Sequence, residues 1–389
     1  IPMMKKTAYP PEFAGAVEAA ASTGGQIMPP IMGAAAFLMA EMVGVPYSDI
    51  IKRAILPAIL YFTGIFLQVH LRAKRLNLKG IPRSELPKWR KLLPKIYLLI
   101  PLVVLVVIIM GGYTMARSAI IATILCVVIS LLDKGVDTAV YHQKNDTSVF
   151  TFLQALENGA RNCLSIAIAC GVAGIIAGVV TMTGLGQIFI SAIVSIANGQ
   201  LIVALFFTMV TCIILGMGVP TTANYIIMAT TCAPILVSGM GMNVIAANMF
   251  VFYFGIVADI TPPVALAAYA GSAIAKANPM KTAIQATRLA IAAFLIPYIF
   301  ALNPAMLLID ATAGQVIQII ITSFVGMFGV AAGIEGYLVK RMNPLERIIV
   351  AAGGLGMLIP GTVTDLIGLG LVVLVAVFQI LHKDKKAAA

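Results

Sequence analysis

The chain has little charge for its length. Only 11% of its 389 residues are Asp, Glu, Lys or Arg, whereas about 25% is usual in a soluble domain. Hydrophobic residues make up 60% of the sequence. So few charges would not cover the surface of a soluble enzyme, and this composition also excludes a disordered chain. We therefore predict an all-α polytopic membrane protein, in which each helical span needs about 20 apolar residues.

Residue types that build enzyme and metal sites are also scarce. The three histidines fall at predicted ends of spans, and the five cysteines lie in apolar stretches without CxxC or other metal-ligand spacing. A membrane enzyme needs a nucleophile, a base or a metal set that converge on one point. Asp259 has no His, second Asp or Ser–Lys pair at a matching depth. We predict that the chain is not an enzyme and has no cofactor.

Basic residues gather between the apolar runs and give the chain a net charge of +11. Residues 72–96 hold nine bases and a single acid, Glu85. This asymmetry predicts a cytoplasmic loop and explains the positive charge without a nucleic-acid partner. The loop 133–160 falls on the same side. Lys52 and Arg53 fall on the opposite side, where we expect a short interfacial helix.

Two apolar segments contain a double proline, which an intact helix does not accommodate. When Pro29-Pro30 is aligned with Pro262-Pro263, the segments also match at Ile27/Ile260, Ala34/Ala267 and Ala35/Ala268. Counting spans from the basic loop gives the two broken helices opposite directions. Such a pair indicates an inverted repeat, and in secondary transporters the unwound points hold substrate and ions near the midplane. Two unrelated proline kinks are the alternative.

A second unusual segment covers residues 200–238. Its centre, Gly216–Tyr225, is rich in glycine and hydroxyl groups, and neither apolar limb is long enough for a comfortable span. We predict a re-entrant hairpin that enters from the outside and places its tip at membrane depth, where protein or a water-filled cavity must receive it. The alternative is a pair of short full spans joined by a surface turn, which would reverse the orientation of the later basic loops.

These features divide the chain into five parts. The first repeat is expected to lack most of its own hairpin, because the sequence starts at Ile1 and only a few residues precede the broken helix. The predicted parts are the remainder of the first repeat (1–71), the basic loop (72–96), scaffold spans with a cytoplasmic loop (97–160), the second repeat (161–303, with its hairpin at 200–238 and its broken helix at 243–275) and extra C-terminal spans with a basic tail (304–389, including an apolar segment at 346–380).

The candidate site lies at the hairpin tip and the two broken helices. Glycines let the backbone approach a ligand, half-helix N-termini favour anions, and half-helix C-termini favour cations. An acid at that depth, such as Asp259, is a functional candidate, and capping of the broken helix is its alternative role. The expected substrate and ion residues are Gly216, Gly218, Pro220, Thr221, Thr222, Asn224, Asp259, Thr261, Pro262, Pro263, Gly24, Gly25, Gln26, Pro29 and Pro30. Na⁺ is expected at Thr221, Thr222, Asp259 and Thr261.

Three segments resemble the large membrane subunit of tripartite ATP-independent periplasmic (TRAP) transporters: PPEFAGAVEAAASTGGQIMPPIMGAAAFLMAE (10–41), ILGMGVPTTANYIIMATTCAPIL (214–236) and GIVADITPPVALAAYAGSAIA (255–275). The similarity covers nearly all of residues 1–303. The GMGVPTTANY form and the extra C-terminal spans look like the fused-permease branch, whose binding protein is of the TAXI type. The resemblance implies an elevator-type, ion-driven importer of organic anions in the inner membrane of a bacterium or archaeon.

The resemblance also implies partners: a periplasmic solute-binding protein and a small membrane subunit or its fused N-terminal equivalent. Because that region is absent from the sequence, we expect that the chain does not transport alone. The coupling ion is expected to be Na⁺, with H⁺ as the alternative. The alternative functions for the chain are an ion-coupled anion symporter that needs no binding protein, an intramembrane enzyme and a channel. A channel requires an open path, which two dead-end hairpins do not provide.

Overall fold

The computed structural model describes residues 1–82, 93–140, 149–359 and 361–381, so parts of the predicted loops 72–96 and 133–160 lie outside the described residues. Within these ranges the chain is helical and has no strand, apart from a lone bridge between Tyr337 and Arg341. This confirms the all-α class of a polytopic membrane protein. Six described helices are long and apolar enough to cross a membrane: Tyr47–Leu76, Ala116–Asp133, Thr221–Gly239, Pro279–Leu302, Ala313–Glu335 and Thr362–Leu381.

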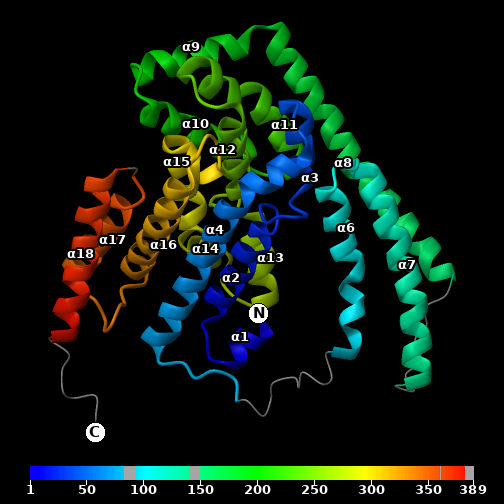
Figure 1. Cartoon of the computed structure of the whole chain (residues 1–389), viewed down its shortest axis with the longest axis horizontal. Helices are drawn as coiled ribbons and strands as arrows, with labels where there is room; N and C mark the ends of the chain where they lie inside the picture. Colours follow the sequence, from blue (N-terminus) through cyan, green and yellow to red (C-terminus); the bar gives the residue numbers. More distant parts are fainter. Residues whose placement is uncertain (83–92, 141–148, 360, 382–389) are drawn as a thin grey trace.

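Figure 1 shows the helices in chain order. Their bounds are α1 (Pro2–Lys6), α2 (Pro11–Gly24), α3 (Ala34–Val43), α4 (Tyr47–Leu76), the 3-10 helix η2 (Leu93–Leu99), α6 (Ile100–Met110), α7 (Met115–Val140), α8 (Val149–Met182), α9 (Leu185–Ala197), α10 (Leu201–Gly216), α11 (Thr221–Thr231), the π-helix η3 (Ile235–Gly239), α12 (Val244–Val257), the 3-10 helix η4 (Ala258–Ile260), α13 (Leu266–Ala275), α14 (Pro279–Leu289), α15 (Ile291–Leu302), the 3-10 helix η5 (Pro304–Leu307), α16 (Ala313–Glu335), α17 (Pro344–Gly356) and α18 (Thr362–Leu381).

Both double prolines interrupt a helix, as predicted. The first lies between α2 and α3, and the second lies between η4, which continues α12, and α13. Both Pro-Pro peptide bonds are cis. In Figure 1, α2 lies below α3 whereas α12 lies above α13, so the two broken helices run in opposite directions. The opposed directions and the shared double proline together favour an inverted repeat over two unrelated kinks.

The predicted hairpin is formed by α10 and α11. Ala204 near the start of α10 and Ile235 after the end of α11 pack in one cluster with Ile193 and Ala197 of α9. Both open ends therefore meet the same helix, so the chain enters and leaves this helix pair on one side. That the tip ends at membrane depth stays a prediction. Helix α9 is not among the predicted spans, because an apolar stretch of that length is too short to cross the membrane. The left-handed residues Gly184 and Asn198 mark its two ends.

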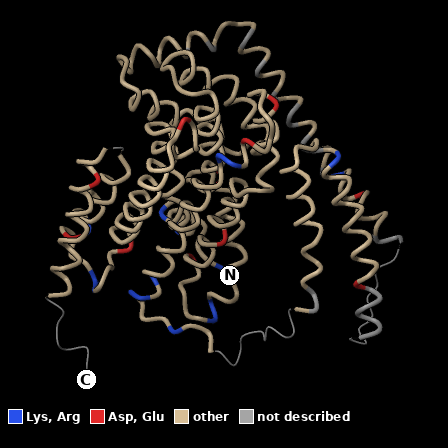
Figure 2. The backbone as a smooth tube through the Cα atoms, in the orientation of Figure 1, with Lys and Arg blue, Asp and Glu red and all other residues tan. Residues whose placement is uncertain are grey.

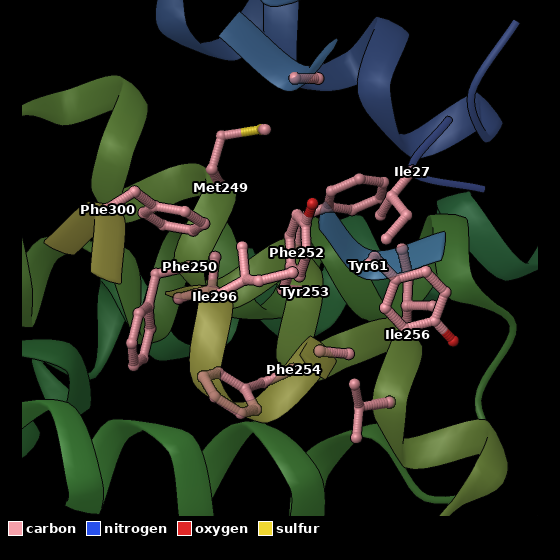
Figure 3. Packing of buried hydrophobic residues seen from close by; sticks show 14 of the residues in the cluster. Ile27, Tyr61, Met249, Phe250, Phe252, Tyr253, Phe254, Ile256, Ile296 and Phe300 are labelled. Carbon is pink, nitrogen blue, oxygen red and sulfur yellow. The ribbon is translucent and has the colours of Figure 1, made fainter. Parts of the chain in front are cut away.

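The core surrounds α12. Every residue from Ile245 to Val257 is buried, as expected of a helix that is apolar on all sides. Figure 3 shows Phe250, Tyr253 and Phe254 of this helix packed among side chains from other elements. Tyr253 meets Phe300 of α15 at a centroid distance of 5.7 Å. Because α12 precedes the second broken segment, this packing fixes the position of that segment.

Several boundaries differ from those expected. Lys52 and Arg53 lie within α4, so the separate interfacial helix is wrong; α4 has 30 residues, more than the roughly 20 needed to span, and its first turns can extend beyond the hydrocarbon. Helix α8 begins at Val149, inside the predicted loop 133–160, and the predicted domain boundary at residue 161 falls within it. The apolar segment 346–380 forms two helices, α17 and α18.

Most described Lys and Arg residues lie toward one end of the molecule, at the bottom of Figure 2. This end includes the C-terminal end of α4, which leads into the basic loop predicted to be cytoplasmic. The positive-inside rule therefore assigns this end to the cytoplasm.

The two broken helices touch through glycine. A Cβ atom added to Gly271 of α13 would lie 2.7 Å from the carbonyl oxygen of Gly15 in α2, and one added to Gly15 would lie 3.0 Å from the carbonyl oxygen of Gly271. Small residues allow membrane helices to approach closely and gain van der Waals contact. The Gly15–Gly271 contact thus joins the two broken helices on the cytoplasmic side of the breaks.

We predict that Gly271→Leu lowers the stability of the detergent-solubilised protein by about 1–3 kcal/mol, because the side chain would force the backbones of α2 and α13 apart. Ala270→Leu is the matched control, since Ala270 is exposed on the same helix. Thermal unfolding of the purified protein measures both. Equal melting temperatures for the two variants would contradict the close contact.

Candidate functional site

The tip of the hairpin is built around Gly216, the last residue of α10. A Cβ atom there would lie 2.7 Å from Asn224 Nδ2 and 2.8 Å from Ala258 Cβ, so glycine is required for the tip to pack against η4. Gly218 has a φ of +76°, which glycine adopts without steric cost. A Cβ atom on Gly218 would lie 4.0 Å from Val264. The tip therefore lies against the unwound part of the second broken helix.

Asn224 joins the hairpin to α12. Its side chain is fully buried, and Nδ2 donates a hydrogen bond to the Gly255 carbonyl oxygen at 3.2 Å. The other amide atom, Oδ1, is buried and has no hydrogen-bond partner among the described residues. A buried acceptor left unpaired costs free energy. It is therefore the kind of group that a bound cation or water satisfies.

Thr221 and Thr222 form the first turn of α11, immediately after Pro220. Both are partly exposed, and neither hydroxyl hydrogen-bonds to another described residue. Thr230 and Thr231 at the far end of the same helix instead donate to the carbonyl oxygens of Ile226 and Ile227. The two hydroxyls at the tip thus lie beside the positive end of a helix dipole and are available to a ligand.

Asp259 lies in η4 and is partly exposed. Its carboxylate accepts no hydrogen bond from the described residues, and helix α13 begins after Ala265 without a side-chain cap. The alternative that Asp259 caps the broken helix is therefore wrong in this conformation. Thr261 Oγ1 donates to the Val257 carbonyl oxygen at 2.8 Å, which leaves its lone pairs free. Pro262 and Pro263 follow directly, between Thr261 and the hairpin contact at Val264.

The predicted residues of the first broken helix lie at the end of α2 and between α2 and α3. Gly24 ends α2, and the carbonyl oxygen of Gln26 accepts a hydrogen bond from the Gly33 amide at 2.8 Å, which closes the turn that holds Pro29 and Pro30. Gly25 is exposed and Gln26 is partly exposed. The Gly24 backbone is held close to α4, because a Cβ atom would lie 2.3 Å from the Tyr61 ring.

A narrow cavity, too small to hold a water molecule, lies between the two broken helices. It is lined by Thr23, Gly24 and Ile27 of the first and by Tyr253, Ile256 and Val257 of the second, together with Tyr61 and Ala293. The hydroxyl of Tyr253 is buried and has no hydrogen-bond partner among the described residues. Figure 3 shows Tyr253, Tyr61 and Ile27 in this region.

Three half-helices end around this point. Helix α2 ends at Gly24 beside the cavity, α10 ends at Gly216 against Ala258, and α12 continues into η4, which ends at Ile260. Helix C-termini carry partial negative charge on unpaired carbonyl groups. Together with Asn224 Oδ1 and the Asp259 carboxylate, they provide the oxygen ligands that a hard cation prefers.

The sequence did not predict which side chains donate hydrogen bonds to the unwound backbone. Tyr47 donates to the carbonyl oxygens of Pro30 at 3.1 Å and Ile31 at 2.9 Å. Tyr269 donates to the Pro263 carbonyl oxygen at 2.7 Å, and Thr287 donates to that of Ile260 at 3.1 Å. A tyrosine hydroxyl therefore bonds to the second proline of each pair. The need for such partners follows from the double prolines, but their positions depend on the fold.

The model of the family described as "Tripartite ATP-independent periplasmic transporter, DctM component" matches residues 1–314. The match includes both broken helices and the hairpin, and it ends near the start of α16. No curated protein matches the chain.

We predict that Tyr47→Phe lowers stability by about 1 kcal/mol, because it leaves the carbonyl oxygens of Pro30 and Ile31 without their donor. Tyr113→Phe is the control, since Tyr113 is half exposed and its hydroxyl bonds to no described residue. Both changes keep the ring. Thermal unfolding separates them, and a Tyr47→Phe variant as stable as the control would show that the hydroxyl does not support the turn.

Proposed function

Because the chain belongs to the DctM family of tripartite ATP-independent periplasmic transporters, we propose that it imports organic anions by cation symport, with Na⁺ as the coupling ion. As a DctM component it is the large permease subunit of a TRAP transporter, a multi-pass protein of the inner membrane. In TRAP systems this component works with a periplasmic binding protein and a small membrane subunit. We propose a TAXI-type binding protein and a small subunit that is separate or fused at the N-terminus.

The proposal of a cation site rests chiefly on Asn224 Oδ1, a buried acceptor without a partner beside the C-terminal end of α10. Na⁺ would be held by this oxygen, by carbonyl groups at the ends of the half-helices, and by Asp259. Thr261 supplies a further hydroxyl oxygen. Unwound carbonyls and half-helix C-termini are the groups that coordinate ions in transporters with broken helices.

The substrate carboxylate fits the opposite kind of helix end. Thr221 and Thr222 lie at the N-terminus of α11, where unpaired amides and the helix dipole favour an anion. The predicted site residues include no Arg or Lys, so the hydroxyls and the dipole would have to balance the substrate charge. Na⁺ at the neighbouring half-helix C-termini adds positive charge, which couples anion binding to cation binding.

Movement would follow an elevator mechanism. The close Gly15–Gly271 contact and the packing of the hairpin tip on η4 support a unit in which both broken helices move together. This unit would carry the site across the membrane relative to the remaining spans. Its transport cycle would begin when the binding protein delivers the anion on the periplasmic side.

We predict that Asp259→Asn reduces Na⁺-driven uptake about tenfold or more, because it removes a charged cation ligand. The measurement is uptake of labelled organic acids into proteoliposomes that contain the permease and its small subunit, with binding protein added, with and without an inward Na⁺ gradient. Asp310→Asn is the control, since Asp310 is an exposed acid between η5 and α16.

Three outcomes would overturn parts of the proposal. Uptake that does not depend on the Na⁺ gradient but depends on a proton gradient would show that H⁺, not Na⁺, is the coupling ion. Uptake without binding protein would favour an independent anion symporter. Equal loss of uptake in the Asp259 and Asp310 variants would remove Asp259 from the ion site.

A further inference from the structure

An open groove of about 680 Å³ lies toward the cytoplasmic end, between α14–α15 and α16–α17. Its walls are largely apolar, with Ile284 and Ile291 on one side and Ile348 on the other, and Pro262 of the second broken helix also borders it. Two basic side chains, Arg288 and Arg347, line the same groove. Half of the groove comes from residues beyond 314, where the family match ends.

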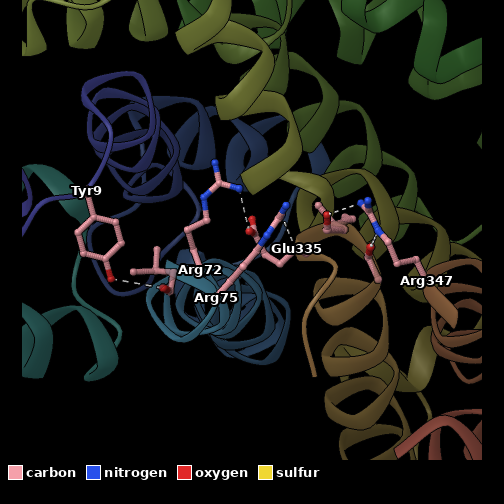
Figure 4. Close-up of polar contacts among 8 residues, drawn as sticks. Tyr9, Arg72, Arg75, Glu335 and Arg347 are labelled. Atoms are coloured by element: carbon pink, nitrogen blue, oxygen red, sulfur yellow. Dashed lines mark hydrogen bonds and ion pairs between the residues drawn. The ribbon is translucent and has the colours of Figure 1, made fainter. Parts of the chain in front are cut away.

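The basic side chains belong to a larger cluster around one acid, Glu335 (Figure 4). Arg72 forms an ion pair with its carboxylate at 3.2 Å, and Arg75 Nη1 donates to its backbone carbonyl oxygen at 2.7 Å. Arg288 also interacts electrostatically with Glu335. Arg341 and Arg347 lie within electrostatic range of Arg75. Three guanidinium groups therefore interact with the single acid Glu335, and two more lie near Arg75, which leaves a positive surplus.

The other nearby acid does not reduce this surplus at the groove. Glu346 is buried and accepts hydrogen bonds from the Asn343 amide at 3.1 Å and from Gln379 Nε2 at 2.7 Å, so it faces away from solvent. Arg347 donates to the carbonyl oxygens of Gly333 at 2.9 Å and Ile334 at 2.8 Å. These bonds fix its position but do not neutralise its charge. The exposed guanidinium of Arg288 makes no hydrogen bond to a described residue.

The apolar wall determines which kind of anion fits. Ile284 is 47% exposed and Ile348 is 66% exposed, so both present hydrocarbon surface next to the arginines. The positive-inside orientation places this groove at the cytoplasmic leaflet, which contains the anionic lipids. A soluble anion would use the arginines alone, whereas a phospholipid would also cover the isoleucines.

We propose that this groove binds an anionic phospholipid of the cytoplasmic leaflet. The Arg288 and Arg347 guanidinium groups hold its headgroup phosphate, and an acyl chain lies along Ile284, Ile291 and Ile348. Arg288 suits phosphate because the planar fork of its guanidinium group donates two hydrogen bonds at once. Arg347 uses Nε and Nη2 for the Gly333 and Ile334 carbonyl oxygens and has Nη1 left for the same phosphate. Since Pro262 borders the groove, the lipid also contacts the turn that carries Thr261 and Asp259.

The test uses the purified permease and two measurements: lipid adducts in native mass spectrometry and the thermal shift on adding lipid. Phosphatidylglycerol is expected to bind and raise the melting temperature, whereas phosphatidylcholine and inorganic phosphate at the same concentration are not. Arg288→Gln is expected to weaken phosphatidylglycerol binding about tenfold, the equivalent of one charge-assisted hydrogen bond.

Lys281→Gln is the matched control, because it removes one exposed positive charge from the same helix outside the groove and should bind phosphatidylglycerol like the wild type. Arg288→Lys keeps the charge without the fork and should give intermediate binding. Equal binding of phosphatidylcholine, an equal shift with inorganic phosphate, or unchanged binding by Arg288→Gln would each overturn the proposal. None of these outcomes depends on transport activity.

Discussion

The structure depends on the hydrogen bonds made by the unwound backbone of the two broken helices, in a region without water. Each double proline removes amide donors and frees carbonyl groups inside a helix that must cross a membrane. The fold supplies donors from other elements: Tyr47 to Pro30, Tyr269 to Pro263 and Thr287 to Ile260. With these bonds made, the breaks persist as fixed turns. The surrounding helices need only bring the remaining carbonyl and hydroxyl oxygens together.

The packing around α12 brings the hairpin tip and the two broken helices together. The helix is buried on all sides, and it meets the hairpin through Asn224 and the first broken helix through the cavity beside Tyr253. The end of α10 therefore lies beside α12 and η4, and the unpaired oxygen of Asn224 is buried at this contact. The proposed site would attract a cation at the C-terminal ends of the half-helices and an anion at the N-terminus of α11.

Local patterns were sufficient to predict the class, the two breaks and the hairpin, because prolines, glycines and apolar runs act within a few residues. Contacts between distant residues were not predictable. The hydroxyl partners lie on other helices, and Arg72 meets Glu335 across 263 positions. Lys52 and Arg53 do not mark a separate helix, since a helix as long as α4 can carry charges beyond the hydrocarbon without ending. All predicted site residues lie at the hairpin tip or at the breaks. The sequence left open whether Asp259 caps a helix, and only the structure shows that its carboxylate caps none.

The central claim is that these half-helix ends form a Na⁺ site around Asn224. Equilibrium binding of Na⁺ to the purified permease, measured by calorimetry with K⁺ at equal ionic strength as the comparison, tests this most directly. The account predicts that the wild type binds Na⁺ in preference to K⁺ and that Asn224→Ala, shown to be folded by its thermal transition, loses this binding. Undiminished Na⁺ binding by a folded Asn224→Ala variant would contradict it.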